Sequence, residues 1–145
     1  MKQMYGVLKM ALEILKNDIG RKSGTVQILN KFEIGIPADT IEDIASYLDI
    51  SVNELMNYLR ISRSTWHRRK KAGKLDFNLS DKVFQVAKLI EYAESVFGSK
   101  EKVRLWFKMP SVVFENRLAL ELLGSLSGIN MINDELTRIE HGVFI

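Results

Sequence analysis

Three features of the sequence predict an all-α fold. Apolar residues recur three or four positions apart in most segments, which is the spacing of one helix face. Glycine and proline stand mainly between these segments, and the chain has only two prolines among its 145 residues. No segment shows the alternation of apolar and polar residues that is typical of a half-buried strand.

Residues 1–33 are predicted to form an N-terminal helix and a linker. Apolar residues from Met4 to Leu15 fall at helical spacing, and charged residues interrupt the run. This pattern indicates an amphipathic helix that serves packing or a dimer contact rather than a secretory leader. The segment from Gly20 to Gly24 is the expected linker.

Two short helices are predicted after the first proline. Asp39 is expected to be the N-cap of the first helix, with Glu42 as the acid of a capping box. Ser51 and Glu54 repeat the same S-x-x-E spacing, and they predict a second helix that ends near Leu59.

A third and a fourth helix follow. Ser62 is the expected N-cap of the third helix, which should run to about Ala72 and end at Gly73. Ser80 is the expected N-cap of a long fourth helix, and Gly98 is its expected stop.

Three more helical segments are predicted beyond residue 98. The first carries Trp106, the second lies around Leu118–Leu123, and the last runs from near Gly128 to Glu140. Gly142 suits the C′ position of the last helix.

The charge of the chain is concentrated in one block. The net charge is +3, from 21 basic and 18 acidic residues. Residues 60–74 hold seven basic residues and no acid, so the other segments together carry 14 basic and 18 acidic residues. Charge gathered in this way indicates a polyanionic partner, with a solvated basic loop as the alternative.

The basic block coincides with a helix-turn-helix pattern. The tight turn LRIS at 59–62 joins the second and third predicted helices, and this arrangement places the second of two steeply crossed helices in the major groove of DNA. Arg60 stands where glycine is usual, and a left-handed conformation there would cost about 1–2 kcal/mol. Met56 stands where a small residue is usual, so a plain three-helix packing unit is the alternative.

The third helix is expected to separate an inward face from a DNA-facing one. Trp66 should face inward, whereas Arg63, Ser64 and His67 lie near the end that meets base edges. His67 is either a base contact or a solvated surface residue. The remaining cations, Arg69 among them, suit phosphate contacts. The predicted DNA-binding residues are Arg60, Arg63, Ser64, His67, Arg68, Lys70, Lys71 and Lys74.

Enzymatic chemistry has little to build on. The chain has no cysteine and only two histidines, which argues against thiolate metal sites, thiol catalysis and a histidine relay. We find no nucleophile–base pair, metal cluster or phosphate loop, so we expect no catalytic residue, no metal and no cofactor. The apolar runs are far shorter than the roughly 20 residues of a membrane span, and we expect a cytoplasmic protein.

Residues 99–145 have a different composition from the basic block. They carry six basic and six acidic residues together with many large apolar ones, so they do not resemble a nucleic-acid surface. The final VFI either docks on the chain's own core or is buried in a partner. Arg138, Glu140 and His141 form the exposed tip that could reach such a partner.

Several phrases taken in order resemble the Xre/ParS/MbcA-type antitoxins. They are GIP at 35–37, LDIS at 48–51, SRSTWHRRKKAGKLD at 62–76, LSDKVFQVAKLIEYAESVFG at 79–98, Trp106, Pro110, LELLG at 120–124, Gly128 and LTRIEHGVFI at 136–145. The resemblance spans about residues 34–145. The chain departs from the family pattern at Arg60, at Glu115–Arg117 in place of a glycine pair, and at Ala119 in place of a proline.

The resemblance implies a non-enzymatic type II antitoxin with two jobs. Residues 34–98 would form the helix-turn-helix domain that represses the operon by binding operator DNA, usually as a homodimer. Residues 99–145 would form the domain that binds a RES-domain toxin, an enzyme that consumes NAD⁺, and occludes its active site. The candidate toxin-binding residues are Trp106, Arg138, Glu140, His141, Gly142, Val143, Phe144 and Ile145. The alternative is a stand-alone helix-turn-helix repressor whose C-terminal module dimerises or binds a ligand.

Overall fold

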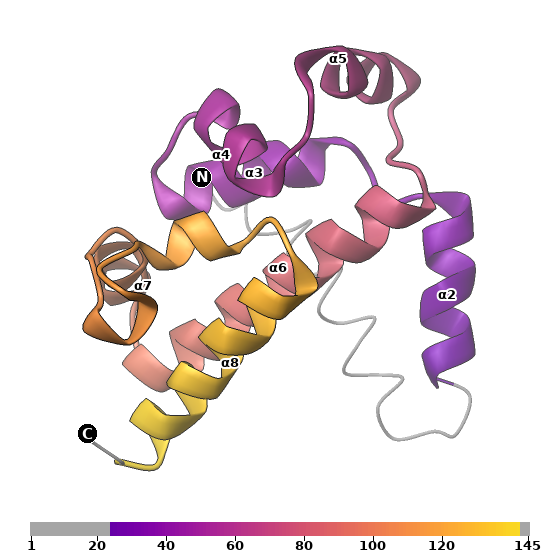
Figure 1. Cartoon of the computed structure of the whole chain (residues 1–145). Coiled ribbons are helices and arrows are strands. Elements are labelled where there is room, and N and C mark those ends of the chain that lie inside the picture. Colours follow the sequence, from indigo (N-terminus) through magenta and orange to yellow (C-terminus); the bar gives the residue numbers. More distant parts are fainter. Residues whose placement is uncertain (1–23, 143–145) are drawn as a thin grey trace.

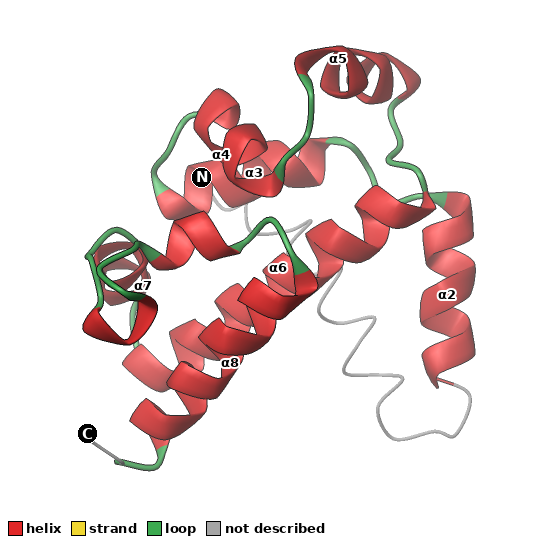
Figure 2. Cartoon of the chain, viewed as in Figure 1, coloured by secondary structure: helices red, strands yellow, loops and turns green. Residues whose placement is uncertain are grey.

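The computed structural model describes residues 24–142, and this part of the chain is all-α, as predicted (Figures 1 and 2). The helices are α2 Gly24–Ile34, α3 Asp39–Leu48, α4 Val52–Leu59, α5 Arg63–Ala72, α6 Phe77–Phe97, α7 Lys100–Phe107 and α8 Leu126–Glu140, with the 3-10 helices η1 Val112–Phe114 and η2 Ala119–Leu122 before α8. The helix expected within residues 1–18 and the final VFI lie outside the described residues. Within them, no helix is long and apolar enough to cross a membrane.

Helix α6 forms the centre of the molecule. Helix α8 runs alongside it, α2 packs near its first turns, and α7 turns back beside its end (Figure 1). One continuous apolar core joins these helices to α3 and α4, from Phe32 to Leu136. The helix-turn-helix segment and the C-terminal segment therefore share a core rather than forming two separately packed bodies.

The local caps confirm most of the predicted helix starts and ends. The hydroxyl of Ser51 accepts a hydrogen bond from the Glu54 amide, and that of Ser62 accepts one from the Thr65 amide. Gly73 and Gly98 end α5 and α6 in the left-handed conformation. Each of these caps depends only on residues within one helical turn, which is why sequence spacing predicts them.

Two predicted caps are wrong. Ala38, not Asp39, is the N-cap of α3 and makes no side-chain cap bond. Asp76, not Ser80, caps α6, where its carboxylate accepts from the Leu79 amide. Ser80 is fully buried inside the helix, and its hydroxyl accepts instead from the Ile36 amide at 3.0 Å.

Two elements differ from the sequence-based expectation. Helix α2 was not predicted; it is held by Phe32, whose ring makes edge contacts with Phe77 and Phe84 at 5.8 and 5.2 Å. The helix expected around Leu118–Leu123 is the short 3-10 helix η2.

Among residues 24–142, four non-glycine residues adopt left-handed backbone conformations. Arg60 has φ 60°, as the turn geometry required, and Asp49 has φ 55°. Glu115 and Asn116 have φ 55° and 65°, and they occupy the place of the glycine pair in the resembling family. Non-glycine residues in this conformation carry backbone strain.

Gly128 is predicted to be essential for the packing of α8. A Cβ at this position would lie 2.0 Å from the carbonyl oxygen of Leu122. Although alanine favours helices, we expect Gly128→Ala to destabilise the fold by about 2–3 kcal/mol through this overlap. The free energy of urea unfolding measures the change. The neighbouring exposed Ser127→Ala is the control and should change it by less than about 0.5 kcal/mol; equal effects of the two substitutions would contradict the prediction.

Asp43 is predicted to make stability depend on pH. Burial, and then the charges of Asp39 and Glu42, raise the pKa of Asp43 to about 6 from 3.8. The folded protein therefore holds this proton more tightly than the unfolded chain, and stability falls as the pH rises from about 4 to about 6.

The substitution Asp43→Asn should remove this dependence. We expect a higher Tm at pH 7 and little change at pH 4, with a gain of at most about 1 kcal/mol because solvent screens the cluster, or a few degrees. Thermal unfolding followed by circular dichroism measures it, with the exposed Asp134→Asn as the control. A lower Tm at pH 7 in the Asp43 variant would show that the carboxylate stabilises the fold.

Candidate nucleic-acid interface and C-terminal module

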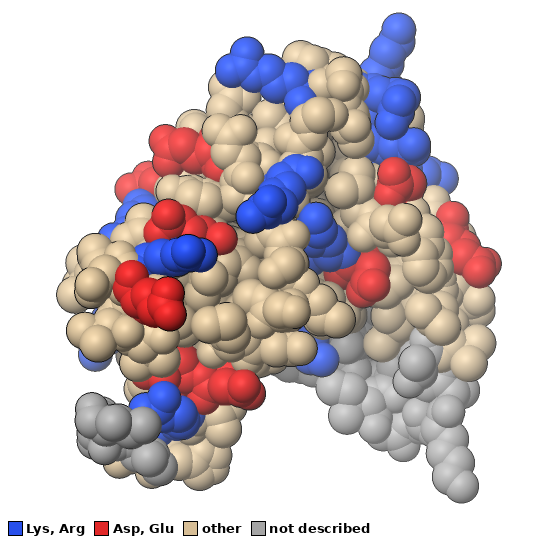
Figure 3. Space-filling model, in the orientation of Figure 1, with Lys and Arg blue, Asp and Glu red and all other residues tan. Residues whose placement is uncertain are grey.

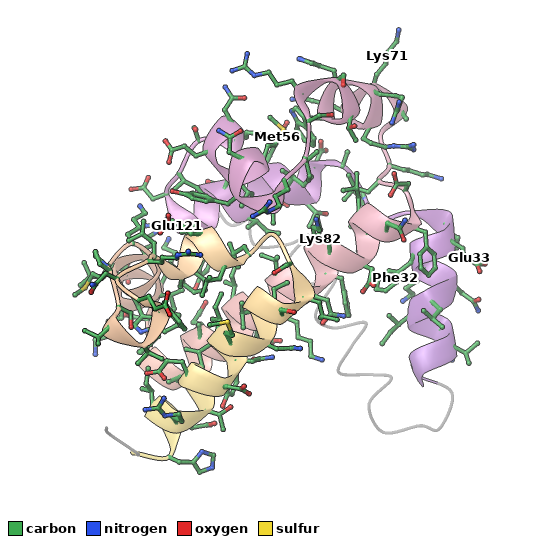
Figure 4. All side chains as sticks on the ribbon, in the orientation of Figure 1. Phe32, Glu33, Met56, Lys71, Lys82 and Glu121 are labelled. Atoms are coloured by element: carbon green, nitrogen blue, oxygen red, sulfur yellow. The ribbon has the colours of Figure 1, made fainter. Side chains whose placement is uncertain are left out.

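The turn between α4 and α5 sets the angle between the two helices. Arg60 in the left-handed conformation lets its amide bond to the carbonyl of Asn57 and the Ile61 amide bond to that of Met56. Ile61 and Trp66 are buried beyond the turn, as are Leu55 and Leu59 before it. Met56, on α4, is buried as well (Figure 4). The apolar positions predicted to pack the helix-turn-helix together thus do so.

Two backbone hydrogen bonds join the segment before α3 to the segment after α5. The Ala38 amide donates to the carbonyl of Gly73, and the Leu75 amide donates to the carbonyl of Ile36. The segments before α3 and after α5 are therefore paired, and α3, α4 and α5 form one closed unit.

Helix α5 presents a basic face to solvent. Arg63, His67, Arg68 and Lys71 are exposed on it, and no residue of α5 is acidic. Lysine and arginine side chains gather over this end of the molecule in Figure 3. Lys71 points away from the body (Figure 4), so its ammonium group is placed to meet a phosphate.

The hydroxyl of Ser64, exposed in the first turn of α5, belongs to a small hydroxyl cluster. The hydroxyls of Ser62 and Ser64 lie 3.2 Å apart, and the Ser62 hydroxyl also bonds that of Thr65 at 2.8 Å. This hydroxyl cluster fixes the first turn of α5, the part that meets base edges in a major-groove reader.

Two of the predicted phosphate contacts are engaged within the protein. Lys70 pairs with Glu42, whose hydrogen bond and charge raise the pKa of Lys70. Its ammonium group also lies 5.7 Å from the centre of the Trp66 ring. Arg69 is half-buried, with its Nε 3.7 Å from the carboxylate of Asp76. These two cations fasten α5 to the body.

Arg60 and Gly124 join the turn to the C-terminal segment. A Cβ on Gly124 would lie 2.6 Å from the carbonyl oxygen of Tyr58 and 3.0 Å from two side-chain atoms of Arg60. The absence of a side chain at Gly124 lets η2 and α8 approach the helix-turn-helix. Arg60 is exposed, but its stem lies along this contact.

The C-terminal module is tied to α3 through two cations that the sequence analysis missed. Arg104 donates to the carbonyls of Ser46 and Tyr47, and Lys108 donates to that of Asp49. These carbonyls belong to the last turn of α3 and the residue after it, where the regular backbone hydrogen bonds of the helix end; that of Ser46 also accepts from the Asp49 amide. The only available signal was the spacing of two cations four residues apart.

Trp106 lies within an aromatic cluster. It is half-buried, and its ring centre lies 5.5 Å from Phe97, 5.2 Å from Phe107 and 6.1 Å from Phe114. This tryptophan connects α6, α7 and η1, so packing occupies much of its surface.

The predicted tip is held against its own helix and α6. Arg138 pairs with Glu135 at 3.0 Å, and a ring nitrogen of His141 lies 2.7 Å from the carbonyl oxygen of Thr137. The Tyr92 hydroxyl on α6 donates to the carboxylate of Glu140. Gly142 has a positive φ of 68°, as expected for the C′ residue. Val143, Phe144 and Ile145 lie outside the described residues.

No metal centre is present among residues 24–142. In this part of the chain no three histidine, aspartate or glutamate side chains are grouped so that they could hold a metal ion. His67 and His141 lie on exposed surfaces of different helical segments.

Comparisons with known proteins identify both halves. The model of the antitoxin Xre-like helix-turn-helix domain matches residues 33–88. The model of the antitoxin Xre/MbcA/ParS C-terminal toxin-binding domain matches residues 93–142. A relative named Antitoxin Xre, from Yersinia enterocolitica, is 28% identical over 123 residues, which cover 83% of this chain and 82% of the relative.

The two matches follow each other in the order that the sequence phrases predicted, and each falls on a unit that the structure builds. The basic helix α5 lies within the first match, and α7 and α8 lie within the second. The chain therefore belongs to the Xre/MbcA/ParS antitoxins, a regulatory and non-enzymatic family with a helix-turn-helix domain followed by a toxin-binding domain.

Proposed function

We propose that this antitoxin neutralises a RES-domain toxin and represses its own operon as a homodimer in the cytoplasm. The observation that carries the DNA-binding half is the acid-free basic face of α5, set in a closed helix-turn-helix unit. The ordered series of phrases from GIP at 35–37 to LTRIEHGVFI at 136–145 supports the RES-domain toxin as the partner.

We assign the two proposed activities to different parts of the chain. We assign DNA binding to residues 34–98 and toxin binding to residues 99–145, with residues 1–33 as an N-terminal extension. Because α6 contributes to both units, the boundary at Gly98 falls at the end of a shared helix.

The α5 side chains have different roles at DNA. Arg63, Ser64 and His67 stand in the first half of the helix, where base edges are read. Arg68 and Lys71, together with Lys74 just beyond the end of α5, supply phosphate contacts. Lys70 contributes less than Lys71, because Glu42 already neutralises it.

DNA binding should depend steeply on salt. Titration of a promoter fragment from the antitoxin's own operon should give a log–log slope of about −0.9 per phosphate neutralised. The double variant Arg63→Ala, Arg68→Ala should lower affinity at least about tenfold, since it removes a base contact and a phosphate contact. Lys71→Ala should reduce the slope by about one unit, and its neighbour Lys70→Ala by clearly less. Salt-independent binding, or full affinity in the double variant, would reject the proposed surface.

Toxin neutralisation should depend on the last residues of the chain. The purified antitoxin should inhibit NAD⁺ consumption by the RES-domain toxin encoded beside it. Deleting residues 143–145 should raise the inhibition constant at least about tenfold, as expected when large apolar anchors leave an interface. The unfolding temperature of the deletion variant is measured alongside. If the tail docks on the chain's own core, its deletion should lower this temperature.

This deletion is a better probe than a truncation before Trp106. Such a truncation would remove Ile132 and Leu136, which are fully buried, and the remaining chain would lose its core. If the full-length chain neither binds nor inhibits the toxin yet binds DNA, the chain acts as a stand-alone repressor.

A further inference from the structure

Four large apolar side chains are exposed within nine residues of the C-terminal module. They are Leu105, Met109, Val112 and Val113, with exposed fractions of 62%, 52%, 86% and 45%. We call them the α7–η1 patch. Exposed apolar surface that is gathered in this way, unlike single exposed residues, marks binding sites.

Helix α7 directs its side chains in three ways. Val103 and Phe107 are fully buried and face the core. Arg104 and Lys108, each one position further along, bind the carbonyls at the end of α3. Leu105 lies at a different angle around α7 from these residues and is 62% exposed, and Met109, two residues beyond the end of α7, is 52% exposed. Arg104 and Lys108 therefore direct their charged groups toward α3.

The second half of the patch is built on a fixed backbone. The Ser111 amide donates to the Arg117 carbonyl, and the Glu115 amide donates to that of Val112. Beneath this loop Phe114 is buried and packs against Trp106. The loop thus holds Val112 in solvent on a rigid support, at the cost of left-handed conformations at Glu115 and Asn116.

The patch lies at the same end of α6 as the C-terminal tip. Phe97, the last residue of α6, packs on Trp106 of α7. Tyr92, little more than a turn earlier, bonds Glu140 at the end of α8. Helix α7 and the end of α8 lie on the same side of the molecule in Figure 1, and α5 lies at its other end.

We infer that the α7–η1 patch is the apolar centre of the toxin interface and binds an apolar surface of the toxin. This inference rests on the proposed function and adds to it the surface that makes the contact. It is carried by the position of the patch inside the matched toxin-binding domain and by its place at the same end of α6 as the tip. Trp106 is half-buried and packs against Phe114 of η1. It therefore supports the patch rather than forming its contact surface.

Other apolar residues of the module do not form such a surface. Leu126 and Met131 are also exposed, but they are five positions apart in the helix, which places them about 140° apart around α8. A second copy of the chain is the competing occupant. The position of the patch within the matched toxin-binding domain favours the toxin over a second copy, and the sedimentation measurement below tests for the second copy.

The test compares matched serine substitutions in the full-length antitoxin. Leu105→Ser and Val112→Ser, singly and together, change the patch, whereas Leu126→Ser is the control with a similar exposed fraction of 66%. Binding to the RES-domain toxin is measured by calorimetry, DNA binding by titration, and oligomeric state by sedimentation. Each patch variant should weaken toxin binding at least about tenfold, with unchanged DNA affinity and unfolding temperature, and the control should bind as the unmodified chain does.

Three results would overturn the inference. The first is unchanged toxin affinity in the double variant. The second is an equal loss in the Leu126→Ser control. The third is unchanged toxin affinity together with a shift from dimer to monomer, which would assign the patch to a second copy of the chain. Failure of the unmodified chain to bind the toxin would instead reject the proposed function, so the two failures are distinguishable.

Discussion

Burial of α6 on more than one side is the constraint on which the other helices depend. Its buried positions include adjacent pairs such as Val83–Phe84 and Leu89–Ile90, so the apolar surface is wider than the stripe of a helix packed on one face. Helices α2, α3, α7 and α8 all contact it. Because the family matches meet within α6, between residues 88 and 93, the DNA-binding and toxin-binding domains are two ends of one core.

Hydrogen bonds from lysine and arginine side chains to backbone carbonyls fix how the helices are oriented around this core. Lys82 of α6 donates to the carbonyl of Leu59 at the end of α4 (Figure 4), and Arg104 does the same at the end of α3. These carbonyls lie where the regular backbone hydrogen bonds of each helix end, and the cations also oppose the negative end of each helix dipole. Gly124 adds a close approach to the α4–α5 turn. These contacts orient the helix-turn-helix and the C-terminal module relative to each other.

The sequence predicts those parts of the fold that depend on nearby residues. The Ser51 and Ser62 caps and the end of α5 at Gly73 are local patterns, and the structure has them. Ser80 was misassigned because its hydroxyl serves an amide 44 positions away, and no local spacing reports such a contact. Helix α2 was not predicted because the segment from Gly20 to Gly24 indicates a linker, and its Phe32 packs on two rings of α6, which no local spacing reports. The basic block was evident in the sequence, but the pairing of Lys70 with Glu42 joins residues 28 positions apart.

The same distinction explains why the sequence locates the basic surface that we propose for DNA better than the apolar surface that we propose for the toxin. A cation is costly to bury, so seven cations in one short acid-free segment must largely face solvent, and the sequence alone locates them. An apolar side chain can lie either in the core or on an exposed binding surface. Val112 and Phe114 stand two positions apart on η1, yet one is 86% exposed and the other is buried under Trp106. Only the fold decides between core and interface for such residues, and here it leaves the exposed ones gathered at the end of α6 that is remote from the basic helix.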